Sequence, residues 1–553
     1  MFIAILLVFY VLFPPEIYDS SFSLFYLSSA LFFVALSRTI SSIKTSILVI
    51  LGVFFFLFSI HSFFAQPFNF KYEMLVITYV IYVALLSSKY ESVFTTYLVK
   101  ALIFLVLLTA GYALYQYFYG YTAEYLKLLP FKDDFLAGKM LVYLKNKRVT
   151  STFALPTTYS AFLMMALPFL VLALKASHRF MKITASIAIA GCFTASILTK
   201  SYFLIPAFII FLITFLFAGY VSFKRPLFYL LLFIIMIGAS LPFIMRKDIS
   251  RNIMKSQTID MRTGNWFVAI NMLKDHMLWG VGTGNFHIYY PRYMKGTDIE
   301  TKYAHNLLLQ IGAETGIIGL VVGLYGFFFI LIRIIHAYKD KRITLEFWAY
   351  STSTLLFMAY SLIDISFYFP SIGFFGIVCI SLFVKEYSHL YPEKSESCKD
   401  FTGSMKAVSF LFIMIFIGIS VVLHYHGTFL EKAIHEATFQ NNEKSLAAVQ
   451  NYIHYFPYDF TAGALMLSLS TSKPSIEEKM MVYETIKTHF TESARLHYLI
   501  ASSYMQEQLY FDAYIHYCIS PLLYPSRPMY TDACSKSQEM IRNLNERYEP
   551  KSP

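Results

Sequence analysis

The residues best suited to chemistry lie between positions 260 and 320. Arg262 is followed by Trp266 and then by Met272 at helical spacing, which predicts an amphipathic interfacial helix with an arginine at its entrance. His305 lies at the mouth of the next apolar run. A guanidinium group binds phosphate oxygens, and an imidazole that titrates near neutral pH can accept a proton from a hydroxyl. This stretch therefore combines a candidate anion-binding group with a candidate general base.

Several polar residues accompany the histidine. Asn306, Gln310 and Glu314 follow at successive steps of four, which predicts one polar helix face inside an apolar segment. Polar groups within a membrane face the interior of the helix bundle, where they either join helices by hydrogen bonds or take part in function. Asp364, near the end of a later apolar run, could orient His305 or an arginine, or could cap a helix. The sequence leaves these alternatives open.

Three glycines between Gly280 and Gly284 permit positive φ angles and close backbone approach. Such a run can form a small nest of amides that binds an anion, but it is more often a tight turn.

The composition indicates the elements that must position these residues. Hydrophobic residues make up 57% of the 553 residues and charged residues only 14%, against about 25% in soluble domains. Apolar runs long enough to cross a bilayer recur along the chain. They predict about thirteen transmembrane helices, near residues 1–13, 22–37, 45–64, 72–88, 94–118, 157–174, 181–198, 203–222, 227–244, 305–335, 345–362, 367–384 and 406–424.

The charges of the short loops predict the orientation. With the N-terminus inside, seventeen Lys and Arg residues fall on the cytoplasmic side, and only Lys71 and Lys200 fall in short outer loops. This places the long loops 119–156 and 245–304, both net basic, outside the cytoplasm together with everything after residue 424. Basic loops in that position can meet lipid headgroups or bind a polyanion such as a diphosphate.

The tail, residues 425–553, changes composition to eleven basic and fourteen acidic residues, and its apolar residues recur at helical spacing. It is predicted to be a separate helical domain, and its segment 501–533 loosely resembles a tetratricopeptide repeat. Cys518 and Cys534 could form a disulfide, but the spacing favours two small buried residues. The five cysteines form no metal-binding pattern, so no metal site is expected.

Five motifs together resemble the O-antigen ligase family, whose shared domain also occurs in O-antigen polymerases and some protein O-oligosaccharyltransferases. The resemblance covers roughly residues 100–385. The motifs are Arg262 with Trp266, Leu278-Trp-Gly-Val-Gly-Thr-Gly-Asn-Phe286, Ala304-His-Asn306, Glu314-Thr-Gly-Ile-Ile-Gly319 and Arg148-Val-Thr-Ser-Thr-Phe-Ala-Leu-Pro156.

This resemblance implies a metal-independent membrane glycosyltransferase of the GT-C type that needs no cofactor. Such an enzyme moves a glycan from an undecaprenyl-diphosphate carrier to an acceptor hydroxyl, on lipid A core or on a protein, at the periplasmic face. By the same resemblance, Arg262 binds the diphosphate and His305 activates the acceptor. In-line attack would invert the anomeric carbon.

One position departs from the family pattern. A second arginine is expected at the start of a span, but this chain reads Thr199-Lys-Ser-Tyr202, with Tyr202 in that place. Lys200 could supply the charge without the bidentate geometry of a guanidinium, and Arg148 and Arg292 are further candidates for the diphosphate site. Asn306, Glu314, Asp364 and Trp266 are expected to support the site.

Alternative functions remain. A polymerase that extends the glycan on its carrier would use the same site, and an ion or bicarbonate-like transporter could use Lys200, Glu314 and Asp364, although no inverted repeat is visible. The prediction is an all-α polytopic protein of the bacterial inner membrane. Its transferase domain is residues 1–424, and its periplasmic helical domain is residues 425–553. The expected partners are the lipid-linked donor, the acceptor, membrane lipids and a protein held by the tail, without nucleic acid.

Overall fold

The computed structural model describes residues 2–13, 42–44, 92–131, 144–175, 178–201, 203–222, 249–294, 301–392, 398–400, 475–487, 493–524 and 528–548, with a few single positions elsewhere. The predicted spans at 22–37, 45–64, 72–88, 227–244 and 406–424 lie wholly or largely outside these residues, and so does Tyr202. The described elements are helices, apart from the antiparallel strands β1 (Ser42–Lys44) and β2 (Cys398–Asp400), in which Ser42 pairs with Asp400.

The helices of the membrane part are α1 (Phe2–Leu12), α5 (Ser92–Tyr115), α6 (Tyr121–Leu128), α8 (Pro156–Ala173), α9 (Arg179–Leu198), α10 (Leu204–Ser222), α12 (Ile249–Asp275), α13 (Phe286–Tyr293), α14 (Leu307–Lys339), α15 (Leu345–Ser361) and α16 (Pro370–Leu390). Three short turns are η1 (Gln116–Gly120), η2 (Leu129–Phe131) and η3 (Ser366–Tyr368). The tail contains α20 (Ile476–Lys487), α21 (Ala494–Gln506), α22 (Tyr510–Leu523) and α23 (Pro528–Tyr548).

Five of the described helices are long and apolar enough to cross a membrane. They cover Phe94–Leu128, Pro156–Ala173, Arg179–Leu198, Leu307–Lys339 and Pro370–Leu390. The protein is therefore a helical membrane protein, as its composition predicts.

The first of these helices is longer than the sequence predicts. The span expected at 94–118 continues to Leu128, so the following loop starts later than residue 119. The expected boundary was wrong because Gly120 does not end the helix. Instead, the π-helical turn η1 absorbs this region, and the helix resumes at Tyr121.

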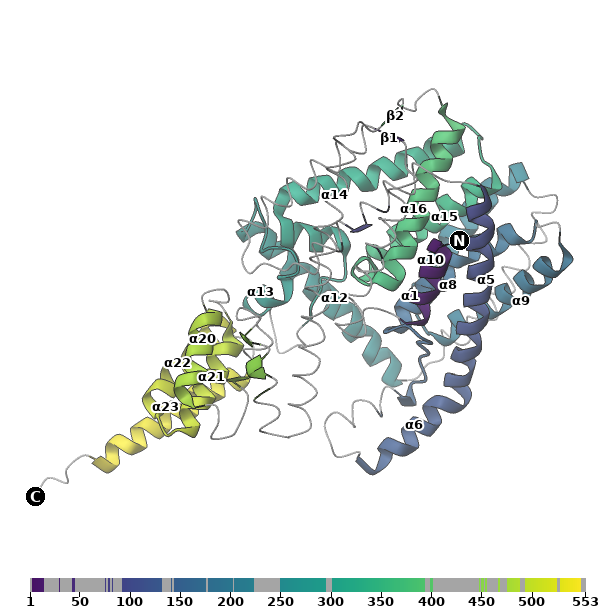
Figure 1. Ribbon diagram of the computed structural model, residues 1–553. Coiled ribbons are helices and arrows are strands. Elements are labelled where there is room, and N and C mark those ends of the chain that lie inside the picture. The colour runs from purple at the N-terminus through teal and green to yellow at the C-terminus, as the bar shows by residue number, and fades with distance from the viewer. Residues whose placement is uncertain are drawn as a thin grey trace, which may run out of the picture.

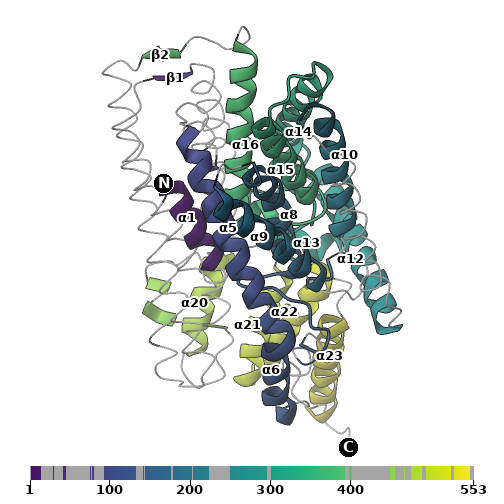
Figure 2. The same ribbon diagram turned by 90° about the vertical axis from the view of Figure 1, so that its right-hand side faces the viewer.

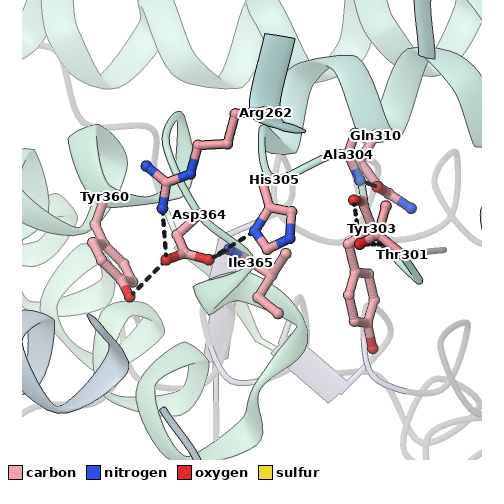
Figure 3. Close-up of polar contacts among 9 residues, drawn as sticks. All are labelled: Arg262, Thr301, Tyr303, Ala304, His305, Gln310, Tyr360, Asp364 and Ile365. Carbon is pink, nitrogen blue, oxygen red and sulfur yellow. Dashed lines mark hydrogen bonds and ion pairs between the residues drawn. The ribbon is translucent and has the colours of Figure 1, made fainter. Parts of the chain in front are cut away.

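Helix α8 forms the centre of the bundle. Nearly all of its side chains are buried, and it packs against α5, α9, α10, α15 and α16 (Figure 2). Aromatic rings fill the gaps around α15, where the rings of Phe211 and Phe215 lie 5.7 and 5.8 Å from that of Trp348. Beside this core α14 contacts both α15 and α12, and the polar residues gather where these three helices meet (Figure 3).

The tail helices lie beside α13, at one end of the molecule (Figure 1). Ala494, Tyr524 and Tyr530 belong to the same apolar cluster as Phe286 and Tyr290 of α13. The hydroxyl of Tyr524 also lies 3.2 Å from the sulfur of Met294. The tail therefore packs on the segment that connects α12 to α14.

Cys518 of α22 and Cys534 of α23 form a disulfide bond. The prediction of two unpaired buried cysteines was wrong. The spacing of sixteen residues does not reveal that α22 and α23 pack side by side, which brings the two Cα atoms to 4.7 Å.

Candidate active site

Three segments bring Arg262, His305 and Asp364 together (Figure 3). Arg262 comes from α12, His305 from the segment before α14, and Asp364 from the turn after α15. The imidazole Nδ1 lies 3.1 Å from Asp364 Oδ1, and a guanidinium Nη2 lies 3.6 Å from Asp364 Oδ2. Asp364 therefore contacts the two residues that the sequence assigned to the chemistry.

The Asp364 carboxylate is 4% exposed and well satisfied by hydrogen bonds. The Ile365 amide donates to Oδ1 at 2.9 Å, and the Tyr360 hydroxyl donates to Oδ2 at 3.4 Å. Burial raises the pKa of this carboxyl, but the hydrogen bond and charge of His305, together with Arg262 and the Ile365 amide, lower it further, so the net pKa lies below the ordinary value. Asp364 is thus an ionised acceptor.

Helix α12 presents Arg262 to the site because neighbouring residues of the same helix are anchored. Val268 and Met272 are buried at helical spacing, and Asn265 accepts a hydrogen bond of 2.7 Å from Tyr290 of α13. Arg262 itself is 22% exposed, so it can face both Asp364 and a ligand. The expected helix from Arg262 through Met272 is confirmed.

Trp266 lies one turn beyond Arg262 and is partly buried. Its indole Nε1 is buried and has no hydrogen-bond partner among the described residues. An indole N–H normally donates to a partner when it is buried, so this atom is a candidate contact for a ligand.

The glycine segment does not form an open anion nest. Gly280, Gly282 and Gly284 all have positive φ, as expected for tight backbone geometry. The amides of Gly284 and Phe286, however, interact with the carboxylate of Glu314, and the Gly282 amide donates to the Glu314 carbonyl at 2.9 Å. The protein's own acidic residue therefore occupies this position, which agrees with the structural reading of the glycines.

The predicted polar face of α14 divides into two roles. Asn306 is the N-cap of α14, and its side chain accepts a hydrogen bond from the Leu309 amide at 3.0 Å. Gln310 and Glu314 share a face, as predicted, and are joined by a hydrogen bond of 2.7 Å. Both side chains are buried.

Arg148 and Lys200 lie together at the junction of α9 and α10. Arg148 Nε donates to the Thr199 carbonyl at 3.2 Å, and Lys200 Nζ donates to the Asn146 carbonyl at 2.5 Å. The ring of Phe203, at the start of α10, lies 4.8 Å from that of Tyr360, which itself contacts Asp364. This ring contact places the junction of α9 and α10 beside Tyr360.

Arg292 occupies a different position. It lies on the exposed side of α13, the helix on which the tail packs, and its guanidinium is 5.9 Å from the centre of the Tyr293 ring. Sequence reasoning grouped it with Arg262, but the structure places it on the tail-binding helix.

Tyr360 and Tyr368 are site residues that the sequence analysis missed. Tyr360 precedes Asp364 by four residues on α15, a spacing that could have drawn attention to it. The Tyr368 hydroxyl donates a hydrogen bond to Glu314 Oε2 at 3.0 Å, although the two residues are 54 positions apart in the sequence. No local sequence pattern predicts a contact over this separation. In the described part of the chain, no cluster of three His, Cys, Asp or Glu side chains is suited to a metal ion.

A family model for O-antigen ligase matches residues 148–324. The match begins at Arg148 and includes Lys200, Arg262, His305 and Glu314, whereas Asp364 lies beyond it. No curated protein matches this chain.

Proposed function

From the premise that this chain carries the domain of the O-antigen ligase superfamily at residues 148–324, we propose that it is a glycan ligase. It transfers a glycan from an undecaprenyl-diphosphate carrier to an acceptor hydroxyl, on lipid A core or on a protein. The observation that carries the proposal is the contact of His305 and Arg262 with opposite oxygens of Asp364. A base and a phosphate-binding cation are the two groups that this reaction needs.

In this mechanism His305 is the general base. Asp364 is ionised and faces Nδ1, so it accepts the Nδ1–H bond and leaves the lone pair of Nε2 for the acceptor hydroxyl. As the acceptor oxygen attacks the anomeric carbon, its proton moves to Nε2 and the bond to the diphosphate breaks. Asp364 then stabilises the imidazolium that forms.

Arg262 stabilises the leaving diphosphate. A guanidinium has five N–H donors, and its contact with Asp364 involves the Nη2 group, so the fork can also bind phosphate oxygens. Arg148 and Lys200 are proposed to add positive charge from the α9–α10 junction. The diphosphate is already an activated leaving group, so the proposed step uses neither metal nor cofactor and inverts the anomeric configuration.

We place the protein in the bacterial inner membrane, with its site and tail in the periplasm. The Cys518–Cys534 disulfide supports this placement because disulfides persist in oxidising compartments. The tail packs on α13, between the segments that carry Arg262 and His305, so both belong on the same side of the membrane as the tail. The tail is proposed to hold the acceptor or a partner protein.

The test compares lipid-linked and acceptor-linked glycan in cells that carry wild type, His305→Asn or Arg262→Gln. Asn suits the positive φ of residue 305 better than Ala, so the variant removes the base with little backbone strain. Arg333→Gln, on the same helix as the site's Gln310 but far along it, is a control for the loss of a basic residue.

For a ligase, both site variants accumulate long lipid-linked chains, and acceptor-linked glycan falls by about 10²-fold or more. If only single repeat units remain on the carrier, the protein is a polymerase of the same superfamily. If both glycan pools are unchanged while the variants are stably inserted, the glycosyltransferase proposal is wrong and the transporter becomes the leading alternative.

A further inference from the structure

The backbone of His305 is in the left-handed region, with φ at 53°. A non-glycine residue in this region is strained and persists only when its surroundings hold it in place. Both neighbours of His305 are in fact held by α14. Asn306 caps this helix, and the amide of Ala304 donates to the side-chain oxygen of Gln310 at 2.5 Å.

The hydrogen bond to Ala304 is one end of a longer chain of contacts. Gln310 Nε2 donates to Glu314 Oε1 at 2.7 Å, and the Tyr368 hydroxyl donates to Glu314 Oε2 at 3.0 Å. Gln310 and Glu314 are each 2% exposed and Tyr368 is 6% exposed, so bulk water does not reach these side chains. The chain therefore connects η3, which follows Asp364, to the residue that precedes His305.

The chemistry of the partners fixes the orientation of the Gln310 amide. A backbone N–H can only donate, so it requires the amide oxygen, and the carboxylate of Glu314 accepts from the amide nitrogen. A rotation of the Gln310 amide by 180° would lose both hydrogen bonds at once. Glu314 is itself held by the amides of Gly284 and Phe286.

We propose that Gln310, Glu314 and Tyr368 form a positioning relay that holds the 301–306 segment so that His305 faces Asp364. None of the three touches substrate in this proposal, and the relay rests on the proposed role of His305 as the base. If these residues only joined neighbouring helices, a hydrogen bond to the Ala304 amide would not be needed, because that bond holds the segment before α14 and not another helix. The Ala304–Gln310 end of the relay is visible beside His305 in Figure 3.

The test uses the full-length protein in lipid nanodiscs. Gln310→Leu keeps a similar side-chain volume but removes the amide oxygen and the amide nitrogen, and with them the hydrogen bonds to Ala304 and Glu314. Tyr368→Phe removes the hydroxyl that donates a hydrogen bond to Glu314. Tyr325→Phe is the matched control, because Tyr325 lies on α14 with 67% exposure. The measurements are kcat and the donor KM for glycan transfer, and amide hydrogen exchange of the peptide that covers residues 301–306.

We expect Gln310→Leu to lower kcat about 10- to 100-fold with the donor KM within about 3-fold of wild type, because misplacement of a catalytic group by about 1 Å costs on the order of 10²-fold. Exchange in the 301–306 peptide should rise in this variant and, to a smaller extent, in Tyr368→Phe. Tyr325→Phe should match wild type in both measurements.

Unchanged kcat and unchanged exchange in Gln310→Leu would overturn the relay. A rise in donor KM without loss of kcat would overturn it too, because it would place Gln310 in donor binding. His305→Asn separates the two proposals. If this variant is inactive while Gln310→Leu is fully active, only the relay fails, whereas full activity of His305→Asn removes the catalytic proposal itself.

Discussion

Asp364 has two carboxylate oxygens, and each one faces a different side chain of the candidate site. The sequence identified Arg262 and His305 because an arginine one turn before a tryptophan and a histidine at the start of an apolar run are local patterns. It left the role of Asp364 open because the partners lie 59 and 102 positions away. Contacts over such separations depend on the packing of α12, α14 and α15, which local patterns do not encode.

Asp364→Asn is predicted to lower the transfer rate by about 10²- to 10⁴-fold. The amide can present its NH₂ group to Nδ1 and so favour the wrong tautomer, with the proton on Nε2. The measurement is the steady-state transfer rate of the purified variant. Thr352→Val, a buried polar change on α15 away from the site, is the control, and a wild-type rate in Asp364→Asn would remove the orienting role.

The lowered pKa of Asp364 predicts how stability depends on pH. A depressed pKa in the folded state stabilises the fold above the unfolded pKa of about 3.9, and this contribution is lost as the pH falls through the folded pKa. The heat-unfolding midpoints of wild type and Asp364→Asn should therefore converge below about pH 4. A difference that stays constant from pH 7 to pH 3 would contradict this assignment.

At the scale of elements, the turn that follows α12 meets α14 through backbone hydrogen bonds. The Ile317 amide donates to the Met277 carbonyl at 2.7 Å, and the Val281 amide donates to the Ala313 carbonyl at 2.9 Å. Gly316, with φ at 68°, makes this approach possible. The sequence shows the glycines but not which segment packs against them. Glycines occur in turns, in anion-binding nests and at close helix contacts, so their presence does not identify the packing partner.

Gly316→Ala is predicted to destabilise the protein by more than about 2 kcal/mol, since the residue would be strained and the added carbon would collide with backbone. Its Cβ would lie 2.2 Å from the Leu278 carbonyl oxygen. Gly326→Ala on the same helix is the matched control, because among the described residues no heavy atom beyond its own stretch of helix backbone lies within 4 Å of the added carbon. Heat unfolding in detergent checks both variants, and equal midpoints would contradict the close approach.

The disulfide stabilises the packing of α22 and α23. Loss of a disulfide that closes a loop of this size is predicted to cost the tail about 3 kcal/mol. Cys518→Ser should therefore make the tail more sensitive to protease in spheroplasts while the membrane helices stay intact. Ser535→Ala, beside the disulfide, should behave as wild type, and equal protease sensitivity of both variants would count against a stabilising bond.

At the scale of the whole molecule, the helical membrane architecture followed from composition, whereas the contact of the tail with α13 did not. The composition of a segment indicates whether it lies in the bilayer or in water. It does not indicate which surfaces of two segments pack against each other. The covering residues Tyr524 and Tyr530 look like ordinary aromatic positions of a soluble helix domain in the sequence.

The side of the membrane that carries the tail is testable directly. A reporter that is active only in the periplasm is predicted to give a signal when it is fused after residue 553, because the loop charges and the disulfide both favour a periplasmic tail. A cytoplasmic signal would contradict the thirteen-span topology and the periplasmic role of the tail together.

The helix from Phe94 to Leu128 is longer than the hydrocarbon core of a bilayer is thick. Its 35 residues extend about 52 Å, well beyond the hydrocarbon thickness of about 30 Å, so a substantial part stands in or above the headgroup layer unless the helix is strongly tilted. Gln116 exchanges two hydrogen bonds with the backbone of Ser151, at 2.8 and 3.1 Å, and Tyr121 donates to the Arg148 carbonyl at 2.9 Å. These contacts tie Arg148 to the part of the helix that extends past the hydrocarbon core, so in the proposed function Arg148 lies at the level where the phosphates of a membrane-anchored carrier would be bound.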